Sequence, residues 1–382
     1  MTAPTVVTFD DPRCLSKAAV GGKAAGLAEM TAAGLPVAPG FAVTTRAFQE
    51  FLALDHVRAQ VDAALDTVGG HDPVSLAAAG ERLHEILLRA DLSAVARDAI
   101  SAAYATLCAT TGIPDVAVAV RSSATAEDSV GASFAGEFET WVDVVGAEAV
   151  IEHVRKCYAS VYSARVLSYL GDHDISPCQI EMAVVVQKTV RARAAGVMFT
   201  LSPVTGDRSK ISIEASWGLG LSVVGGEVTP DRFLVDKVSL TIGERVPGDK
   251  RIEYRRGDAS VEVERARWAQ LCLTDEEVTA LAAIGKQLER RHGGPQDIEF
   301  ALDEELPGGE HVVLLQCRPE TVWSKIERKP AFTAGAGLMS WVTGSVSGGA
   351  AGAPRHAHDH SHDHSASPDA SPDASHGAWS GQ

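Results

Sequence analysis

The sequence predicts an α+β fold, because segments patterned as strands and segments patterned as helices are mixed along its length. Residues 116–120 (VAVAV) alternate valine with alanine, which predicts a buried strand that ends at Arg121. Residues 148–170 carry apolar side chains on one face of a predicted amphipathic helix. Residues 297–300 and 312–316 predict two strands that return on each other as a hairpin.

Other elements follow from spacing and caps. Residues 46–111 are rich in Ala and Leu at helical spacing and predict three or four helices, one of which begins after Ser93. The sequence Thr274-Asp-Glu-Glu277 predicts a capping box for a helix that runs to about Arg291. Residues 245–268 are charged and irregular, which predicts an excursion on the surface.

Composition limits the class of protein. The 382 residues are enough for two or three subdomains, and 45% hydrophobic with 22% charged residues is an ordinary globular profile. The net charge of −16 argues against nucleic acid as the main partner, because phosphate backbones select clustered Lys and Arg. The first residues lack a signal-peptide pattern, no long apolar run predicts a membrane span, and the six cysteines are scattered. We therefore expect a cytoplasmic protein with reduced cysteines and no membrane partner.

The segment after the predicted strand contains groups that suit a polyphosphate. Arg121 is followed by Ser122 and Ser123, and the next loop carries Gly131 and Gly136. An arginine offers a planar fork of donors to phosphate oxygens, and glycines let backbone N–H groups approach them closely. The same residues fit an ordinary polar turn between two strands equally well.

A second candidate phosphate site lies near the N-terminus. Gly21, Gly22 and Lys23 come just before a predicted helix over residues 24–33, which Gly34 ends. A helix N-terminus beside a lysine can bind phosphate, although the spacing of a P-loop is absent. A surface lysine is the alternative.

The predicted hairpin brings Glu299, Gln316 and Arg318 towards one end. A carboxylate and an amide oxygen are the hard ligands that Mg²⁺ prefers, and Mg²⁺ usually shares its coordination with substrate phosphates. An arginine beside them can face the same phosphates. The alternative is a solvated acidic hairpin.

Three of these motifs occur together in a known family. The strings GGKAAGLAEM…GLPVAPGFAVTT, RSSATAED…ASFAGEFET and DIEF…LLQCRPE resemble the N-terminal ATP-grasp domain of the phosphoenolpyruvate synthase, pyruvate phosphate dikinase and rifampin phosphotransferase family. The likeness runs from about Ala18 to Ser324. It implies an ATP-grasp domain over residues 1–328 that holds ATP between two lobes, with lobe boundaries near residues 115, 195 and 245.

The resemblance also implies roles for the phosphate and metal ligands. Lys23, Arg121 and Arg318 would contact the nucleotide phosphates, and the two arginines would act on the transferring group as catalytic residues. Glu299 and Gln316 would bind magnesium as well as nucleotide.

Further nucleotide-binding residues are implied around the base and the loop. Gln187 ends a strand that would line the adenine pocket, and Gly136 and Thr140 would also bind nucleotide. Leu221 departs from the family pattern, because many members carry an acidic residue there, and Phe300 replaces a common Trp.

Members of this family split ATP, pass its β-phosphoryl group to a histidine on a swivelling domain, and release AMP and phosphate. The sequence contains no TSHAA-like phosphohistidine motif. We therefore expect the ATP-binding subunit of a split phosphotransferase, which needs a separate phosphohistidine-domain subunit as its partner. The final acceptor is left open between pyruvate, a phenol and an antibiotic hydroxyl. Two alternatives are a non-catalytic ATP-binding module and a metal-handling module.

The C-terminal part has a different composition. Residues 329–353 are rich in glycine and predict a flexible linker, and residues 354–382 predict a disordered tail rich in His and Asp. Five histidines recur at every second position and could bind Zn²⁺ or Ni²⁺: His356, His358, His360, His362 and His364. Adventitious metal binding and an engineered tag are the alternatives.

Overall fold

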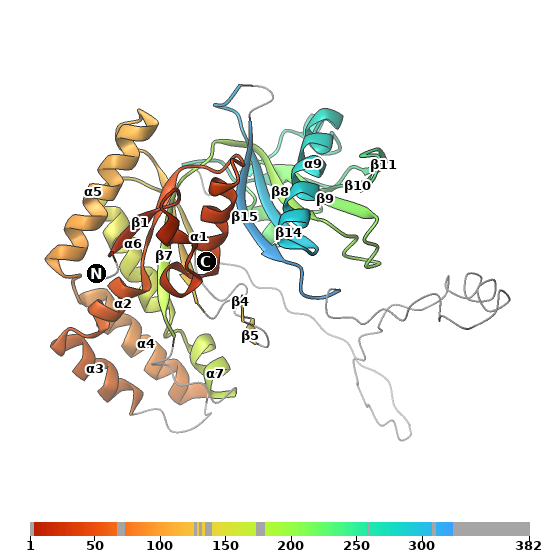
Figure 1. Cartoon of the computed structure of the whole chain (residues 1–382). Helices are drawn as coiled ribbons and strands as arrows, with labels where there is room; N and C mark the ends of the chain where they lie inside the picture. Colours follow the sequence, from red (N-terminus) through yellow and green to blue (C-terminus); the bar gives the residue numbers. More distant parts are fainter. Residues whose placement is uncertain are drawn as a thin grey trace, which may run out of the picture. The chain divides into compact units, whose positions relative to one another are not determined.

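The computed structural model describes residues 4–66, 73–125, 128–129, 132–133, 140–172, 180–257, 260–307 and 311–323. These residues belong to one compact unit. It contains two main antiparallel sheets, and helices pack against both of them (Figure 1). The α+β class is therefore confirmed. Within these ranges no helix combines the length and the apolar character needed to cross a membrane.

The first sheet has the strand order β1-β2-β7-β3-β6. Its strands are β1 (Val6–Thr8), β2 (Gly40–Val43), β7 (Met182–Lys188), β3 (Val118–Ala124) and β6 (Thr140–Val144). The central strand β7 is buried on both faces. Val184 and Val186 pack with one core, while Val185 between them packs with the other.

Six helices form the first core with this sheet. They are α2 (Thr45–Leu52), α3 (Asp55–Leu65), α4 (Pro73–Arg89), α5 (Ala94–Thr111), α6 (Ala147–Ser160) and α7 (Ala164–Asp172). Three or four helices were expected between residues 46 and 111, and the structure has four, α2 to α5. The Ser93 hydroxyl accepts a hydrogen bond of 3.2 Å from the backbone N–H of Ala96 at the start of α5, as the predicted helix start requires.

The single helix expected over residues 148–170 is wrong. The chain leaves the helix after Ser160 and starts α7 at Ala164. Tyr162 in the break is fully buried, and the Ser163 hydroxyl accepts a hydrogen bond of 3.3 Å from the N–H of Val166. A local cap therefore begins a new helix within a continuous apolar pattern.

The second sheet has the order β11-β10-β9-β8-β14-β15. Its strands are β8 (Ala192–Phe199), β9 (Lys210–Trp217), β10 (Asp231–Asp236), β11 (Ile242–Val246), β14 (Gln296–Asp303) and β15 (Val312–Pro319). Helix α9 (Asp275–His292) packs on it. The predicted capping box is present, because the Thr274 hydroxyl and the Glu277 carboxylate each accept the other's backbone N–H.

Small elements complete the described structure. The short helix α8 (Leu221–Val224), the 3₁₀ turn η3 (Arg265–Arg267) and the strand pair β12 (Ile252–Glu253) with β13 (Val261–Glu262) belong to the second lobe. The 3₁₀ turn η1 (Pro12–Leu15) precedes α1, and the strand pair β4 (Asp128–Ser129) with β5 (Ala132–Ser133) lies between β3 and β6 in the chain. The five cysteines of the described ranges are free thiols, as predicted. Burial raises the pKa of Cys14 to about 12, so this thiol is unreactive at neutral pH.

Helix α1 (Lys17–Ala32) joins the two lobes. Its Ala24 and Leu27 share a core with Val185 of the first sheet and with Ile298 and Leu314 of the second. Figure 1 shows α1 beside β7 and β15, and the backbone N–H of Leu314 donates to Pro36 at 2.7 Å. The two sheets are therefore held around one helix, without a freely hinged linker between them.

The strand expected to end at Arg121 is longer. Strand β3 continues to Ala124, and Ser122 and Ser123 are both buried within it. Hydrogen bonding to β7 continues along the whole strand, which explains why the serines do not start a loop. Arg121 therefore projects from the middle of a sheet.

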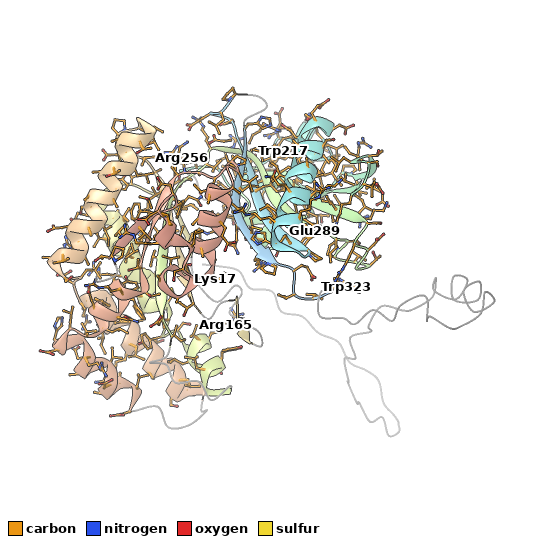
Figure 2. All side chains as sticks on the ribbon, viewed as in Figure 1. Lys17, Arg165, Trp217, Arg256, Glu289 and Trp323 are labelled. Carbon is orange, nitrogen blue, oxygen red and sulfur yellow. The ribbon has the colours of Figure 1, made fainter. Side chains whose placement is uncertain are left out.

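The described chain ends on a fixed side chain. The indole N–H of Trp323 donates to the carbonyl of Pro203 at 2.7 Å, and its backbone N–H donates to Glu320 at 2.9 Å (Figure 2). Its ring lies against Gly206, which has φ of +69°, and a Cβ at that position would lie 2.4 Å from the ring. Only glycine satisfies both conditions there.

The expectation that residues 245–268 lie entirely on the surface is wrong, because Lys250 is fully buried. Its ammonium group donates to the Asp231 carboxylate, which is also fully buried. Asp231 also accepts hydrogen bonds from the backbone N–H groups of Gly248 at 2.8 Å and Cys272 at 2.7 Å. This carboxylate therefore connects three separate segments of the second lobe.

We expect Lys250→Met to lower the free energy of unfolding by about 3–5 kcal/mol, because it leaves the Asp231 carboxylate buried without its cation. Urea unfolding followed by circular dichroism measures this change. The matched control is Arg251→Gln, whose exposed ion pair with Asp249 lies one residue away. Equal unfolding midpoints for the two variants would contradict the assignment.

Candidate functional site

The centre of the site is Arg121, which reaches from the first sheet to three oxygen atoms of the second. Its Nη1 donates to the carbonyl of Leu315 at 3.1 Å. Its Nη2 donates to Glu299 Oε2 at 3.1 Å and to Gln316 Oε1 at 2.9 Å. The Nε is buried and has no hydrogen-bond partner among the described residues. The Nε donor of this guanidinium is therefore left unsatisfied by the described residues.

Alternation along β3 explains why Arg121 points this way. Val118 and Val120 belong to the core formed with helices α2–α7. Residues 119, 121 and 123 consequently project from the opposite face, towards the second sheet. Ala119 and Arg121 line a cavity there, and Ser123 contacts α1.

The oxygens of Glu299 and Gln316 are suited to share a cation. These residues are direct partners across β14 and β15, and both accept hydrogen bonds from the same Arg121 nitrogen. The two oxygens therefore face a common point that already holds positive charge. A carboxylate and an amide oxygen match the ligand preference of Mg²⁺. No cluster of three or more His, Cys, Asp or Glu side chains is placed to bind a metal in the ranges given above, so water or substrate oxygens would complete the coordination.

Arg318 lies on the same face of the hairpin. It pairs with its cross-strand partner Asp297, with Nη2 and the carboxylate 2.7 Å apart. Burial raises the pKa of Asp297, while the Arg318 guanidinium acts in the opposite direction. Positions 297, 299, 316 and 318 thus form one row of charged and polar groups, as the predicted hairpin requires.

Lys23 is positioned by a contact between two of the sequence motifs. Gly21 adopts φ of +73° and kinks α1, and a Cβ there would lie 2.0 Å from the Ser123 carbonyl oxygen. The Ser123 hydroxyl donates to Val20 at 2.7 Å and accepts from the N–H of Ala24 at 3.2 Å. These contacts attach the part of α1 after the kink, which carries Lys23, to Ser123 of β3. Ser123 is two residues from Arg121 in the same strand.

A cavity of about 170 Å³ lies between the two sheets at this site. Arg121, Thr140, Gln187 and Glu299 all line it, so it brings together four of the predicted residues. Thr140 is the partner of Arg121 across β3 and β6. Gln187 is buried and donates to the carbonyl of Ala38 at 3.1 Å, which leaves its side-chain oxygen as the group that could meet a ligand. The remaining lining is mostly alanine, valine, leucine and glycine, which suits a flat apolar base.

Sequence reasoning missed Lys188, which also lines the cavity. Its ammonium group lies 3.7 Å from Asp303 and 3.6 Å from Glu305. The sequence feature that could have indicated it is a lysine at the end of an otherwise apolar strand. Leu221, where many family members carry an acidic residue, also lines the cavity and presents an apolar side chain there.

Several predictions lie outside the described residues, so they stay predictions. They concern Gly131, Gly136, the linker over residues 329–353, and the tail over residues 354–382 with its five histidines.

Comparison with known proteins agrees with the resemblance. The model of the family described as pyruvate phosphate dikinase, AMP/ATP-binding domain, matches residues 17–335. The phosphoenolpyruvate synthase of Aeropyrum pernix is 41% identical over 335 residues, covering 80% of this chain and 41% of the relative. The probable phosphoenolpyruvate synthase of Methanothermobacter thermautotrophicus is 39% identical over 304 residues, covering 79% and 44%. The phosphoenolpyruvate synthase of Pyrococcus furiosus is 37% identical over 344 residues, covering 79% and 42%.

The chain thus spans 41–44% of the length of these three relatives. The matched region contains α1, the second sheet, the first sheet except β1, and the residues around Arg121. This chain belongs to the family of the pyruvate phosphate dikinase AMP/ATP-binding domain.

Proposed function

We propose that this protein is the ATP-binding part of a phosphotransferase with an ATP-grasp fold. It binds Mg·ATP between its two sheets and passes a phosphoryl group to a histidine on a separate subunit, with release of AMP and phosphate. The observation that carries the proposal is the contact of Arg121 with Glu299 and Gln316 across the two sheets. If these residues have the roles that the family resemblance implies, this contact brings the phosphate-binding Arg121 and the magnesium ligands Glu299 and Gln316 to one point.

The proposed chemistry is electrostatic. Lys23, Arg121 and Arg318 hold the phosphate charge and orient the transferring group, which is the main task in phosphoryl transfer. Glu299 and Gln316 hold Mg²⁺ together with phosphate oxygens. When bound, the metal neutralises charge that develops on those oxygens.

The adenine base occupies the apolar part of the cavity in this proposal. Gln187 and Thr140 lie at its edges, where an amide oxygen and a hydroxyl can accept or donate hydrogen bonds. The base would be enclosed by both sheets, so nucleotide binding would involve both lobes.

In this proposal the receiving histidine belongs to a phosphohistidine domain outside these 382 residues, which contain no TSHAA-like segment. That nucleophile would dock beside Arg121 and accept the phosphoryl group, splitting one difficult transfer into two. The acceptor that follows is chosen by the partner. A non-catalytic ATP-binding module is the alternative, and the retention of cation and metal ligands at one point favours turnover.

The first prediction concerns nucleotide binding. The protein should bind ATP in magnesium buffer, and Arg121→Gln should weaken binding about tenfold or more, because it removes a charged donor group from the phosphates. Isothermal titration calorimetry measures both affinities. Arg58→Gln is the matched control, since Arg58 is an exposed arginine of α3 that lies outside the cavity. A folded protein that does not bind ATP would refute the proposal.

The second prediction concerns the metal ligands. Glu299→Ala should abolish turnover with the partner and remove the gain in ATP affinity that Mg²⁺ provides, while the fold stays intact. The reason is that this carboxylate is a metal ligand and contributes little to the core. Calorimetry with and without Mg²⁺ separates the two effects, and Glu244→Ala on the exposed strand β11 is the control. A variant that keeps the full magnesium effect would show that Glu299 is not a ligand.

The third prediction concerns the partner. With ATP labelled in the β-phosphate, this chain alone should form little AMP and should phosphorylate neither pyruvate, a phenol nor an antibiotic hydroxyl. Adding a subunit that carries a TSHAA-type histidine should transfer the label to that subunit and release AMP. Replacing that histidine by alanine should prevent the transfer. Robust acceptor phosphorylation by this chain alone would contradict the separate-subunit proposal.

A further inference from the structure

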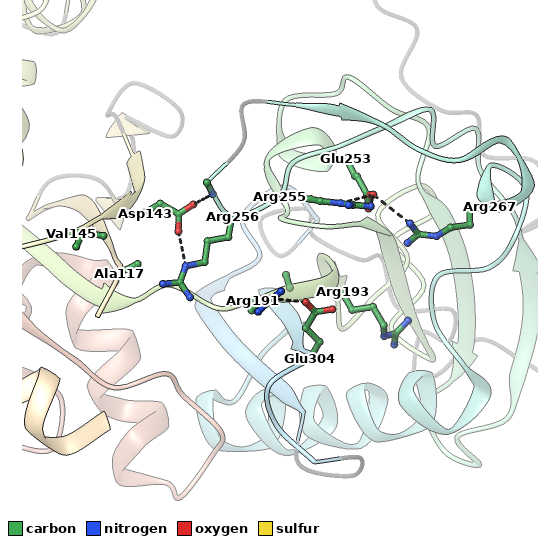
Figure 3. Close-up of a pocket in the computed structure, with 12 residues that line it drawn as sticks. Ala117, Asp143, Val145, Arg191, Arg193, Glu253, Arg255, Arg256, Arg267 and Glu304 are labelled. Carbon is green, nitrogen blue, oxygen red and sulfur yellow. Dashed lines mark hydrogen bonds and ion pairs between the residues drawn. The ribbon is translucent and has the colours of Figure 1, made fainter. Parts of the chain in front are cut away.

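A second cavity, of about 750 Å³, lies along the seam between the two sheets (Figure 3). It shares no lining residue with the nucleotide cavity. Its walls come from both lobes, with Ala117, Asp143 and Val145 on one side and residues 191–193, Glu253 and residues 255–257 on the other. A volume of this size lies within the range of about 300–1,000 Å³ that is usual for small-molecule sites.

The lining is rich in arginine although the whole chain carries a net charge of −16. The arginines are Arg191, Arg193, Arg255, Arg256 and Arg267. Three carboxylates, Asp143, Glu253 and Glu304, line the same cavity. Outside the lining, Glu277 pairs with Arg193 at 2.6 Å and Glu305 lies 3.9 Å from Arg191. Each arginine therefore has a carboxylate partner, and only Glu253 is shared between two arginines.

The clearest local imbalance is at Glu253, which is buried and shared by two arginines. Its Oε1 accepts a hydrogen bond from Arg255 Nε at 2.9 Å and from Arg267 Nη1 at 3.4 Å. One negative charge therefore faces two guanidinium groups. Arg267 is held in place by stacking over the Trp217 ring, with 4.1 Å between its Cζ and the ring centroid.

One arginine of the cavity has a partner that an anion can replace. The side chain of Arg191 is 59% exposed, and its partner Glu304, at 2.7 Å, is 48% exposed. An ion pair this exposed contributes little stability, so Arg191 can exchange Glu304 for a multivalent anion at small cost. The side chain of Arg255 is 57% exposed but its partner Glu253 is buried, so an anion binds Arg255 beside that carboxylate and does not displace it. Arg256 pairs with Asp143 of the other lobe at 3.2 Å, which places it at the seam.

We propose that this cavity binds a small anion that bears a phosphate group, at a site distinct from the nucleotide cavity. Guanidinium groups match phosphate oxygens in planar, bidentate geometry, and Arg191, Arg255 and Arg267 all line this one cavity. The bound anion contacts the Arg255–Arg267 pair and Arg191, and it neutralises the charge that Glu253 leaves uncompensated.

The test uses labelled inorganic pyrophosphate as the probe. Equilibrium dialysis of the full chain, with a non-hydrolysable ATP analogue at saturation, should show one bound pyrophosphate. The double variant Arg191→Gln/Arg255→Gln should weaken this binding about tenfold or more while the analogue binds as before. Arg251→Gln is the matched control, because Arg251 is an exposed arginine outside the cavity, and it should bind pyrophosphate normally.

Three results would overturn the proposal: no pyrophosphate bound, complete displacement of pyrophosphate by the analogue, or equal affinity in the double variant and the wild type. The outcome is separable from that of the proposed function. If the ATP analogue does not bind while pyrophosphate binds in an Arg191- and Arg255-dependent manner, the proposed function fails and the anion site stands.

Discussion

The arrangement of the site depends on one partly buried guanidinium. Arg121 is charged and only 13% exposed, so it requires oxygen partners, and the second sheet supplies three of them. This requirement fixes the position of Glu299 and Gln316 relative to the first sheet. A phosphate that approached the same guanidinium would compete with Glu299 for it. The ion pair between the sheets and the proposed ligand contact are therefore alternatives, and the exchange between them couples nucleotide binding to the contact between the lobes.

Much of the fold was predictable because its signals are local. The capping box at Thr274, the cap at Ser93 and the hairpin that pairs Glu299 with Gln316 each depend on residues close together in sequence. The predictions were wrong where contacts between residues distant in sequence determine the structure. The strand continues beyond Arg121 because β7 pairs with it, and Lys250 is buried because Asp231 lies behind it. Neither partner can be found from local spacing.

The candidate site was predictable mainly through motifs. Without the family resemblance, the sequence around Lys23 fits an ordinary surface lysine, and the sequence around Arg121 fits an ordinary polar turn. The physical link between their motifs is the Ser123 hydroxyl, which bonds to both sides of the kink at Gly21. This contact joins residues about a hundred positions apart, so no spacing rule reveals it. Lys188 was missed for a related reason, since only the pairing of sheets shows which end of β7 faces the cavity.

The fixed position of Trp323 has a consequence for any polypeptide that continues beyond it. Because the indole is bonded to Pro203 and packed on Gly206, the continuing chain starts from a defined origin on the second lobe. Residue 323 is thus a rigid attachment point, and replacing its indole by a smaller side chain would loosen this end of the second lobe without altering a single residue of the site.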